Sequence, residues 1–326
     1  MCKTLSMSRI SDVAGNLSPT AGDFVEVAVF DRDGIIESRH RGIGALVGPD
    51  GLLIAELGSS QKLIYPRSAV KPIQVVAMRR AGLRLEGAEL AICCGSHQGT
   101  QAHRELVESI LKTAGLNQDD LQCPLAWPGN AAARAQVTGE SRLAFNCSGK
   151  HAGFLAASVA AGWPTDDYLS PQHPLQVLVR EVLEEFAGEK IAHTTADGCG
   201  APLHALSTAG LARAIGKVAA SEPDITSAML ENPWAVGDTK SMDALVMHQD
   251  MIAKIGAEGI FVIGLKTGHG VAVKIEDGSM RAAPLVALKM LHDNGLIDHD
   301  AYGDLKVSLA VHAMGGDKVL GELRAL

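Results

Sequence analysis

Residues 65–72 are Tyr65-Pro66-Arg67-Ser68-Ala69-Val70-Lys71-Pro72, and no other stretch of the chain says as much about its fold and chemistry. If this segment is helical, residues three apart lie on one face, so the Ser68 hydroxyl would lie beside the Lys71 amine. A free hydroxyl is a poor nucleophile at neutral pH, but a neighbouring neutral amine can take its proton. The Ser-x-x-Lys spacing therefore predicts a serine nucleophile with a lysine base.

Composition narrows the class of protein around this motif. With 326 residues and 47% hydrophobic content, the chain can bury the core of one large or two modest domains. Its net charge is −8 and no long basic run is present, so we expect no nucleic-acid partner. No apolar run is long enough to span a membrane, and Met1–Asn16 lacks the apolar centre of a signal peptide. We therefore expect a cytoplasmic protein with no membrane partner.

The order of the expected elements predicts the architecture. Phe24–Leu57 is rich in strand patterns, with turns at Asp33-Gly34 and Pro49-Asp50-Gly51. Gly259–Leu265 and Gly270–Ile275 are also expected strands. Helices are expected at 68–82, 103–114, 151–161, 174–186, 202–215 and 282–291, with two more between 225 and 255. The chain is thus expected to be α/β (α+β), with a largely antiparallel sheet built from both chain ends and helices packed on it.

This architecture gives the expected domain organisation. Residues 1–22 are interpreted as a disordered leader and residues 23–326 as one catalytic domain, with a helical subdomain at about 85–255. Serine β-lactamases, penicillin-binding proteins and glutaminases are built in this way. In such proteins the Ser-x-x-Lys motif opens the first helix after the first strands, where it also falls here.

Three further segments combine glycine with reactive side chains. The first is Cys93–Thr100, which contains Ser96 and His97. The second is Phe145–His151, and the third is Asp197–Pro202. The second and third each carry one cysteine, and together these could supply two thiolates to one metal ion. Because the chain's six cysteines are sparse and neither segment has the Cys-x-x-Cys spacing, two buried structural cysteines remain the alternative.

Taken together and in this order, these segments resemble the asparaginase II family, the rhizobial-type L-asparaginases. The resemblance runs from about Val25 to Ala313 and includes Lys254–Gly259 and Gly270–Gly278. It implies a β-lactamase- and glutaminase-like fold, hydrolysis of L-asparagine to L-aspartate and ammonia, and a homodimer. The resemblance also implies roles for individual residues. The catalytic residues would be Ser68, Lys71, Ser96 and Lys274, the substrate-binding residues Arg67, His97, His151 and Asp197, and the zinc ligands Cys147, Lys150 and Cys199.

The sequence does not decide which serine–lysine pair attacks the substrate. We assign Ser68 as nucleophile and Lys71 as its base, while Ser96 and Lys274 could relay protons or attack in their place. A zinc ion held by two thiolates and an amine would be a weak Lewis acid suited to orienting substrate. A β-lactamase-like hydrolase or peptidase, a glutaminase, and a non-catalytic amide or metal sensor on the same fold are the alternative functions.

Overall fold

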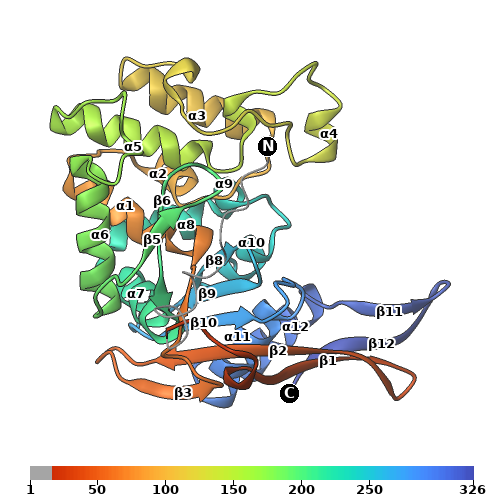
Figure 1. Ribbon diagram of the computed structural model, residues 1–326. Coiled ribbons are helices and arrows are strands. Elements are labelled where there is room, and N and C mark those ends of the chain that lie inside the picture. The colour runs from red at the N-terminus through yellow and green to blue at the C-terminus, as the bar shows by residue number, and fades with distance from the viewer. Residues whose placement is uncertain (1–16) are drawn as a thin grey trace, which may run out of the picture.

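The computed structural model describes residues 17–326 and consists of a curled antiparallel sheet with helices on both of its faces (Figure 1). The helical middle of the chain lies above the sheet in this view, and the last helices lie behind it. The first 16 residues of the expected leader lie outside the described residues. Residues 17–22 are described, and the carbonyl of Leu17 accepts a hydrogen bond from the N–H of Leu63 at 2.8 Å.

Strands from both ends of the chain form the main sheet, as predicted. Its order is β11-β12-β1-β2-β10-β9-β8, with β3 also paired to β2, and these pairs are antiparallel. The strands of this sheet are β1 (Val25–Arg32), β2 (Ile35–Val47), β3 (Leu53–Leu57), β8 (Ile252–Gly256), β9 (Ile260–Gly264), β10 (Gly270–Ile275), β11 (His312–Gly315) and β12 (Lys318–Ala325).

The hairpin turn at Asp33-Gly34 is confirmed, because β1 ends at Arg32 and β2 begins at Ile35. Both turn residues have positive φ angles, as a type I′ turn requires. The turn near Asp50 likewise joins β2 to β3. Two short ladders lie outside the main sheet: β4 (Leu63–Ile64) with β7 (Leu206–Ser207), and β5 (Thr194–Ala196) with β6 (Pro202–His204).

The middle of the chain is mainly helical, as predicted. The first helical turn there is the 3-10 helix η3 (Arg67–Val70), which runs directly into α1. The helices that follow η3 are α1 (Lys71–Arg80), α2 (Gly87–Cys93), α3 (Gln101–Thr113), α4 (Ala131–Arg134), α5 (Ser148–Ala161), α6 (Pro174–Ala187), α7 (Thr208–Ser221), α8 (Pro223–Glu231), α9 (Pro233–Val236), α10 (Met242–Met247), α11 (Ala283–Asp293) and α12 (His299–Ser308).

The helix expected at 202–215 begins later in the structure than predicted. Residues 202–207 form strands β6 and β7, and α7 begins only at Thr208, where Ser207 caps it by accepting from the Gly210 N–H. The strand pairing of β6 depends on β5, a contact that local sequence patterns do not reveal. The β5–β6 hairpin matters for function because residues 197–201 form the loop at its tip. Within residues 17–326, no helix has the length and apolar character needed to cross a membrane.

Candidate active site

Lys71 lies at the junction of η3 and α1, and its amine reaches across to the segment that follows α2. The Lys71 Nζ donates to the Ser96 Oγ at 3.0 Å and to the carbonyl of Gly95. The side chain is buried. The Ser68 hydroxyl has no hydrogen-bond partner among residues 17–326, although its backbone carbonyl accepts from the N–H of Lys71. The closest serine–lysine contact is therefore between Lys71 and Ser96.

This pairing differs from the one predicted from sequence, which joined Lys71 to Ser68. The cause is the end of α2, where the last carbonyls of the helix lack partners within it and carry partial negative charge. Gly95 lies two residues beyond Cys93, the last residue of α2, and its carbonyl attracts the Lys71 amine. Gly95 is also essential to this packing, because an added Cβ would lie 2.8 Å from the carbonyl oxygens of Ala235 and Val236.

His97 fixes the Ser96 loop to helix α5. Its Nδ1 accepts from the Gly99 N–H at 3.1 Å, so we assign the proton to Nε2, which lies 2.9 Å from the Ser148 Oγ. Burial lowers the pKa of His97 well below its ordinary value. The imidazole, predicted to bind substrate, thus has both ring nitrogens engaged within the protein.

The three side chains expected to bind zinc lie together on α5 and the β5–β6 loop. The Lys150 amine is 3.0 Å from the Cys199 sulfur, and the sulfurs of Cys147 and Cys199 are hydrogen-bonded to one another. The bond from Cys199 lowers the pKa of Cys147 well below its ordinary value. Although burial opposes its charge, Cys199 and Cys147 raise the pKa of Lys150. These directions favour a thiolate at Cys147 beside an ammonium at Lys150.

This donor set suits zinc. Sulfur and nitrogen ligands are those that zinc binds in proteins, and a metal-bound lysine must give up its proton. The Nε2 of His151, the residue after Lys150, is buried without a hydrogen-bond partner in the described part of the chain. Such an orphaned atom is common beside a bound ligand. No group of three or more His, Cys, Asp or Glu side chains in residues 17–326 is arranged to hold a metal, so the amine is essential to this set.

Lys71 connects the two groups, because its amine lies close enough to the Cys147 thiol to lower the pKa of that thiol. Ser96, Lys71, Cys147, Cys199 and Lys150 therefore form one cluster of neighbouring polar groups, which we call the lysine–thiol centre. Helices α1, α2 and α5 supply its walls from the helical layer above the sheet (Figure 1). A buried amine beside a hydroxyl and a thiol pair can accept, hold and return a proton.

Arg67 and Asp197 lie beside the lysine–thiol centre. The Arg67 Nε donates to the Asp197 Oδ1 at 2.7 Å, and Asp197 belongs to the same loop as Cys199. Burial opposes the charge on Asp197, but the Gly198 N–H and Arg67 more than offset this effect and lower the pKa of the carboxyl.

His151, also expected to bind substrate, lies inside the helical layer. Its Nδ1 is hydrogen-bonded to the Tyr168 hydroxyl at 2.7 Å.

Lys274 and Ser96, the second pair expected from sequence, are not in hydrogen-bond contact. The Lys274 amine on β10 donates to the carbonyls of Glu258 at 2.5 Å and Ile275 at 2.7 Å. Glu258 lies in the turn between β8 and β9, and Ile275 is the last residue of β10, so the lysine is held between them. Lys274 therefore stabilises the backbone of the β8–β9 turn.

A different lysine, which sequence reasoning did not single out, lies nearer to Lys71. Lys254 on β8 is fully buried, donates to the Ile255 carbonyl at 3.0 Å and pairs with the Asp243 carboxylate at 3.4 Å. Burial lowers the pKa of Lys254, although Asp243 opposes this effect, and the positive charge of Lys71 lowers it further. The sequence indicates this buried lysine by the pattern Ile252-Ala253-Lys254-Ile255, in which apolar residues flank the lysine.

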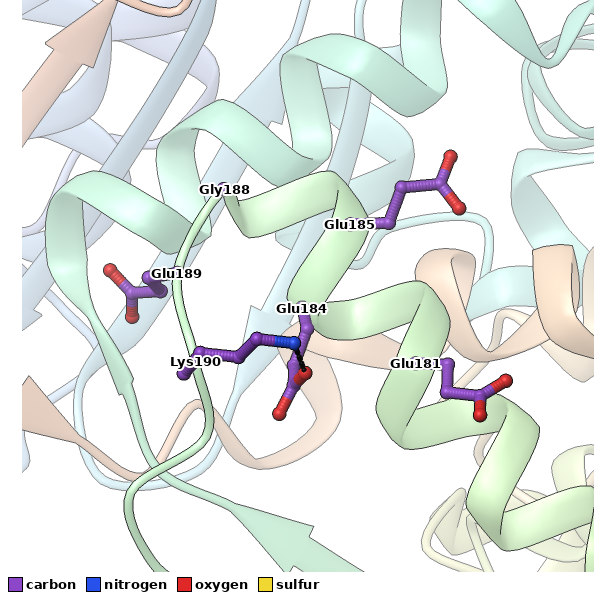
Figure 2. A pocket seen from close by; sticks show the side chains of 6 residues that line it. All are labelled: Glu181, Glu184, Glu185, Gly188, Glu189 and Lys190. Atoms are coloured by element: carbon purple, nitrogen blue, oxygen red, sulfur yellow. Dashed lines mark hydrogen bonds and ion pairs between the residues drawn. The ribbon is translucent and has the colours of Figure 1, made fainter.

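Another pocket, at the end of α6, has a different character. Glu181, Glu184, Glu185 and Glu189 line it, and Figure 2 shows their carboxylates pointing to different sides. Glu184 pairs with Lys190, Glu185 pairs with Arg80, and Glu189 accepts from the backbone and hydroxyl of Ser207. Because three of the four carboxylates are satisfied within the protein, this pocket is a weaker candidate than the lysine–thiol centre.

Comparison with known proteins identifies the family. A family model described as L-asparaginase II matches residues 28–325. The chain belongs to the L-asparaginase II family. The L-asparaginase II match covers nearly the whole described structure, including every residue of the lysine–thiol centre, and it implies an amidohydrolase.

Two other comparisons accompany this result. A β-lactamase from Mycobacterium bovis is a similar solved structure, with 14% sequence identity and a TM-score of 0.37. The similarity covers 77% of this chain and 94% of the β-lactamase chain. A search of curated proteins finds no match.

Proposed function

We propose that the protein is an L-asparaginase, which hydrolyses L-asparagine to L-aspartate and ammonia. The observation that carries the proposal is the buried Lys71 amine, 3.0 Å from the Ser96 hydroxyl and near the Cys147 thiol, in a chain of the L-asparaginase II family. Amide hydrolysis needs a nucleophile and a group that takes its proton and later gives one to the leaving ammonia. A buried lysine in contact with a serine can serve both purposes.

In this proposal Ser68 attacks the side-chain carboxamide of asparagine. Its hydroxyl has no competing hydrogen bond in the described residues, whereas Ser96 already accepts from Lys71. Lys71, with its amine unprotonated, takes the Ser68 proton and returns it to the departing nitrogen, which leaves as ammonia. The aspartyl ester on Ser68 is then hydrolysed by water, with Lys71 again accepting a proton. Contacts between nucleophile and base are often loose before substrate binds.

Ser96 has a supporting role in this proposal. By accepting from Lys71 it fixes the amine beside the scissile bond, and His97 fixes Ser96 in turn. Lys254, paired with Asp243, is a second buried lysine near Lys71.

Zinc is the proposed metal, held by Cys147, Lys150 and Cys199. When bound, the ion would orient the substrate and polarise it weakly, because two thiolates already neutralise its charge. The proton transfers described above remain the work of Lys71 and the serines.

The test is ammonia release from L-asparagine, with L-glutamine and the β-lactamase substrate nitrocefin measured alongside. We expect kcat/KM for asparagine to exceed that for glutamine by about 100-fold or more, because one added methylene misplaces the amide carbon. Equal values would contradict the selectivity and favour a glutaminase, and nitrocefin turnover would favour a β-lactamase. Ammonia release from neither amide, with binding retained, would favour a sensor. The Lys71→Met variant, purified in the same way, controls for contaminating enzymes.

A cytoplasmic homodimer is the proposed setting for this activity. It rests on the sequence composition and on the family resemblance. Light scattering of the purified protein, measured over a range of concentrations, tests the dimer, and a monomer throughout that range would contradict it.

A further inference from the structure

A pocket beside the lysine–thiol centre is lined by charged side chains of both signs. It has a volume of about 670 Å³, and apolar side chains that include Leu63, Ile64 and Ala205 form much of its wall. Arg67, Glu258 and Lys274 also line it. Arg67 immediately precedes Ser68, so the pocket adjoins the proposed nucleophile.

Arg67 presents a free edge to this pocket. Its Nε is engaged by Asp197 at 2.7 Å, and this ion pair fixes the plane of the guanidinium. The two Nη groups have no hydrogen-bond partner within residues 17–326. A guanidinium held in this way can donate two parallel hydrogen bonds to one carboxylate.

Glu258 presents the opposite charge. Its carboxylate makes no hydrogen bond or ion pair in the described part of the chain. Its backbone, in contrast, is held firmly, because the Glu258 carbonyl accepts from the Lys274 amine at 2.5 Å. Lys274 therefore positions the turn, and the exposed Glu258 carboxylate, which also attracts the Lys274 charge, remains open to a ligand.

The two residues also share an uncommon backbone conformation. Arg67 has a φ of +52° and Glu258 a φ of +64°, in the left-handed region that favours glycine. Only two other non-glycine residues in the described range, Asp33 and Asp250, have positive φ. Side chains held at such positions carry a conformational cost, and they are concentrated at functional sites.

Close backbone packing brings these two strained positions to one pocket. Gly256, two residues before Glu258, packs so tightly that an added Cβ would lie 2.6 Å from the carbonyl oxygen of Pro66, the residue before Arg67. The β8–β9 turn and η3 are thus joined through their backbones, with one charged side chain projecting from each.

We propose that Arg67 and Glu258 form a clamp for the zwitterionic head group of an α-amino acid, with Arg67 binding its carboxylate and Glu258 its ammonium. This inference rests on the proposed function and makes Glu258 a specificity-determining residue for it. With the head group held in this way, the side-chain amide extends toward Ser68.

The first test measures binding, so that it does not depend on turnover. Calorimetry compares L-aspartate with succinate, which is aspartate without its ammonium, for the wild-type protein and for Glu258→Gln. Because hydrogen bonds between charged groups are strong, we expect Glu258→Gln to weaken aspartate binding about 10- to 100-fold. Succinate binding should change less than about twofold or become tighter. Equal weakening of both ligands, or unchanged aspartate binding, would overturn the clamp.

Two further variants separate this role from a structural one. Glu276→Gln removes a carboxylate that pairs with Arg41, outside the pocket, and should leave aspartate affinity unchanged. Glu258→Gly relieves the strain at φ +64°, so it should keep or raise thermal stability while losing the preference for aspartate over succinate. A glycine variant that retains this preference would contradict the proposal.

The same comparison in turnover links the clamp to the reaction. Glu258→Gln should raise KM for L-asparagine with little loss of kcat, and should not affect succinamate, the analogue without the ammonium. If the wild-type protein binds aspartate through Glu258 but releases no ammonia from asparagine, the clamp stands and the proposed asparaginase fails. If the wild-type protein binds neither aspartate nor asparagine, the clamp is overturned.

Discussion

The amine of Lys71 lies 3.0 Å from the hydroxyl oxygen of Ser96, although the two residues are 25 positions apart in the sequence. This contact joins the first helix of the domain to the loop after α2. Lys71 also lies three positions beyond Ser68, whose carbonyl accepts from the Lys71 backbone N–H, and its amine lies near the Cys147 thiol, so one lysine interacts with both serine segments and with a thiol. Removing the Lys71 side chain should therefore affect more than one part of the site.

We expect Ser68→Ala and Lys71→Ala each to reduce kcat at least ~10³-fold, because removing one member of a catalytic unit abolishes most of its effect. Ser96→Ala should cost less, since it removes only the contact that orients the lysine. Steady-state ammonia release measures all three, and thermal melts confirm that each variant is folded. Should Ser68→Ala keep most of its activity while Ser96→Ala loses it, Ser96 is the nucleophile.

The buried pair of Asp243 and Lys254 gives a prediction for stability. Asp243→Asn leaves a fully buried ammonium without its partner, and we expect it to lower the free energy of unfolding by about 3–5 kcal/mol. The double variant Asp243→Leu/Lys254→Met removes both charges and should recover much of that loss. Urea unfolding at pH 7 compares the three proteins, and a double variant as unstable as Asp243→Asn would contradict this account.

Activity of the same double variant tests whether Lys254 matters for the reaction. If its charge supports an unprotonated Lys71, the variant should be stable but slow, with its pH–rate profile shifted toward alkaline pH. Wild-type rates in a protein lacking both side chains would confine the pair to a structural role.

We expect one zinc ion per chain, bound by Cys147, Lys150 and Cys199. Cys199→Ala should lower the zinc content and raise KM more than it lowers kcat, because the ion is proposed to orient substrate. Metal analysis of protein purified without added zinc gives the content, and Cys94→Ala, which changes a buried cysteine outside the group, is the matched control. Fully active protein with almost no zinc would rule out the metal site.

Local patterns in the sequence predicted the parts of the fold that depend on local chemistry. The Asp33-Gly34 turn and the apolar run of β10 are examples. A tight hairpin turn requires residues that tolerate positive φ, and a buried strand requires apolar residues. The strands at Pro202 and beyond residue 311 were missed: β6 pairs with β5 across the 197–201 loop, and β12 pairs with β1 at the other end of the chain. We expected a helix to begin at Pro202, but this proline begins strand β6.

The candidate site was predicted as a set of segments, but its internal pairing was not. Sequence spacing placed Ser68 beside Lys71, while the fold directs the amine to Gly95 and Ser96. Such a contact depends on where α2 ends in space, which spacing along one segment cannot reveal. Lys274 was assigned from the family resemblance, which gives no distances, and Lys254, which the resemblance did not single out, is the buried lysine near Lys71.

The last prediction concerns acid stability and His204, at the end of the β5–β6 hairpin. Burial lowers the pKa of His204 from 6.5 to about 4, and its Nε2 has no hydrogen-bond partner in the described residues. The unfolded chain therefore binds a proton more readily than the folded protein does between these two values. Stability from this residue is fully present above pH 6.5 and is lost as the pH falls toward about 4.

We expect this one histidine to account for about 2 kcal/mol of the stability lost between pH 7 and pH 5. Other buried histidines, such as His97, act in the same direction, so the comparison must be with a matched variant. His204→Asn keeps a polar atom near the Thr194 hydroxyl but cannot take up the proton. Urea unfolding at both pH values should show a smaller loss for His204→Asn than for the wild-type protein, and equal losses would show that His204 does not control the acid response.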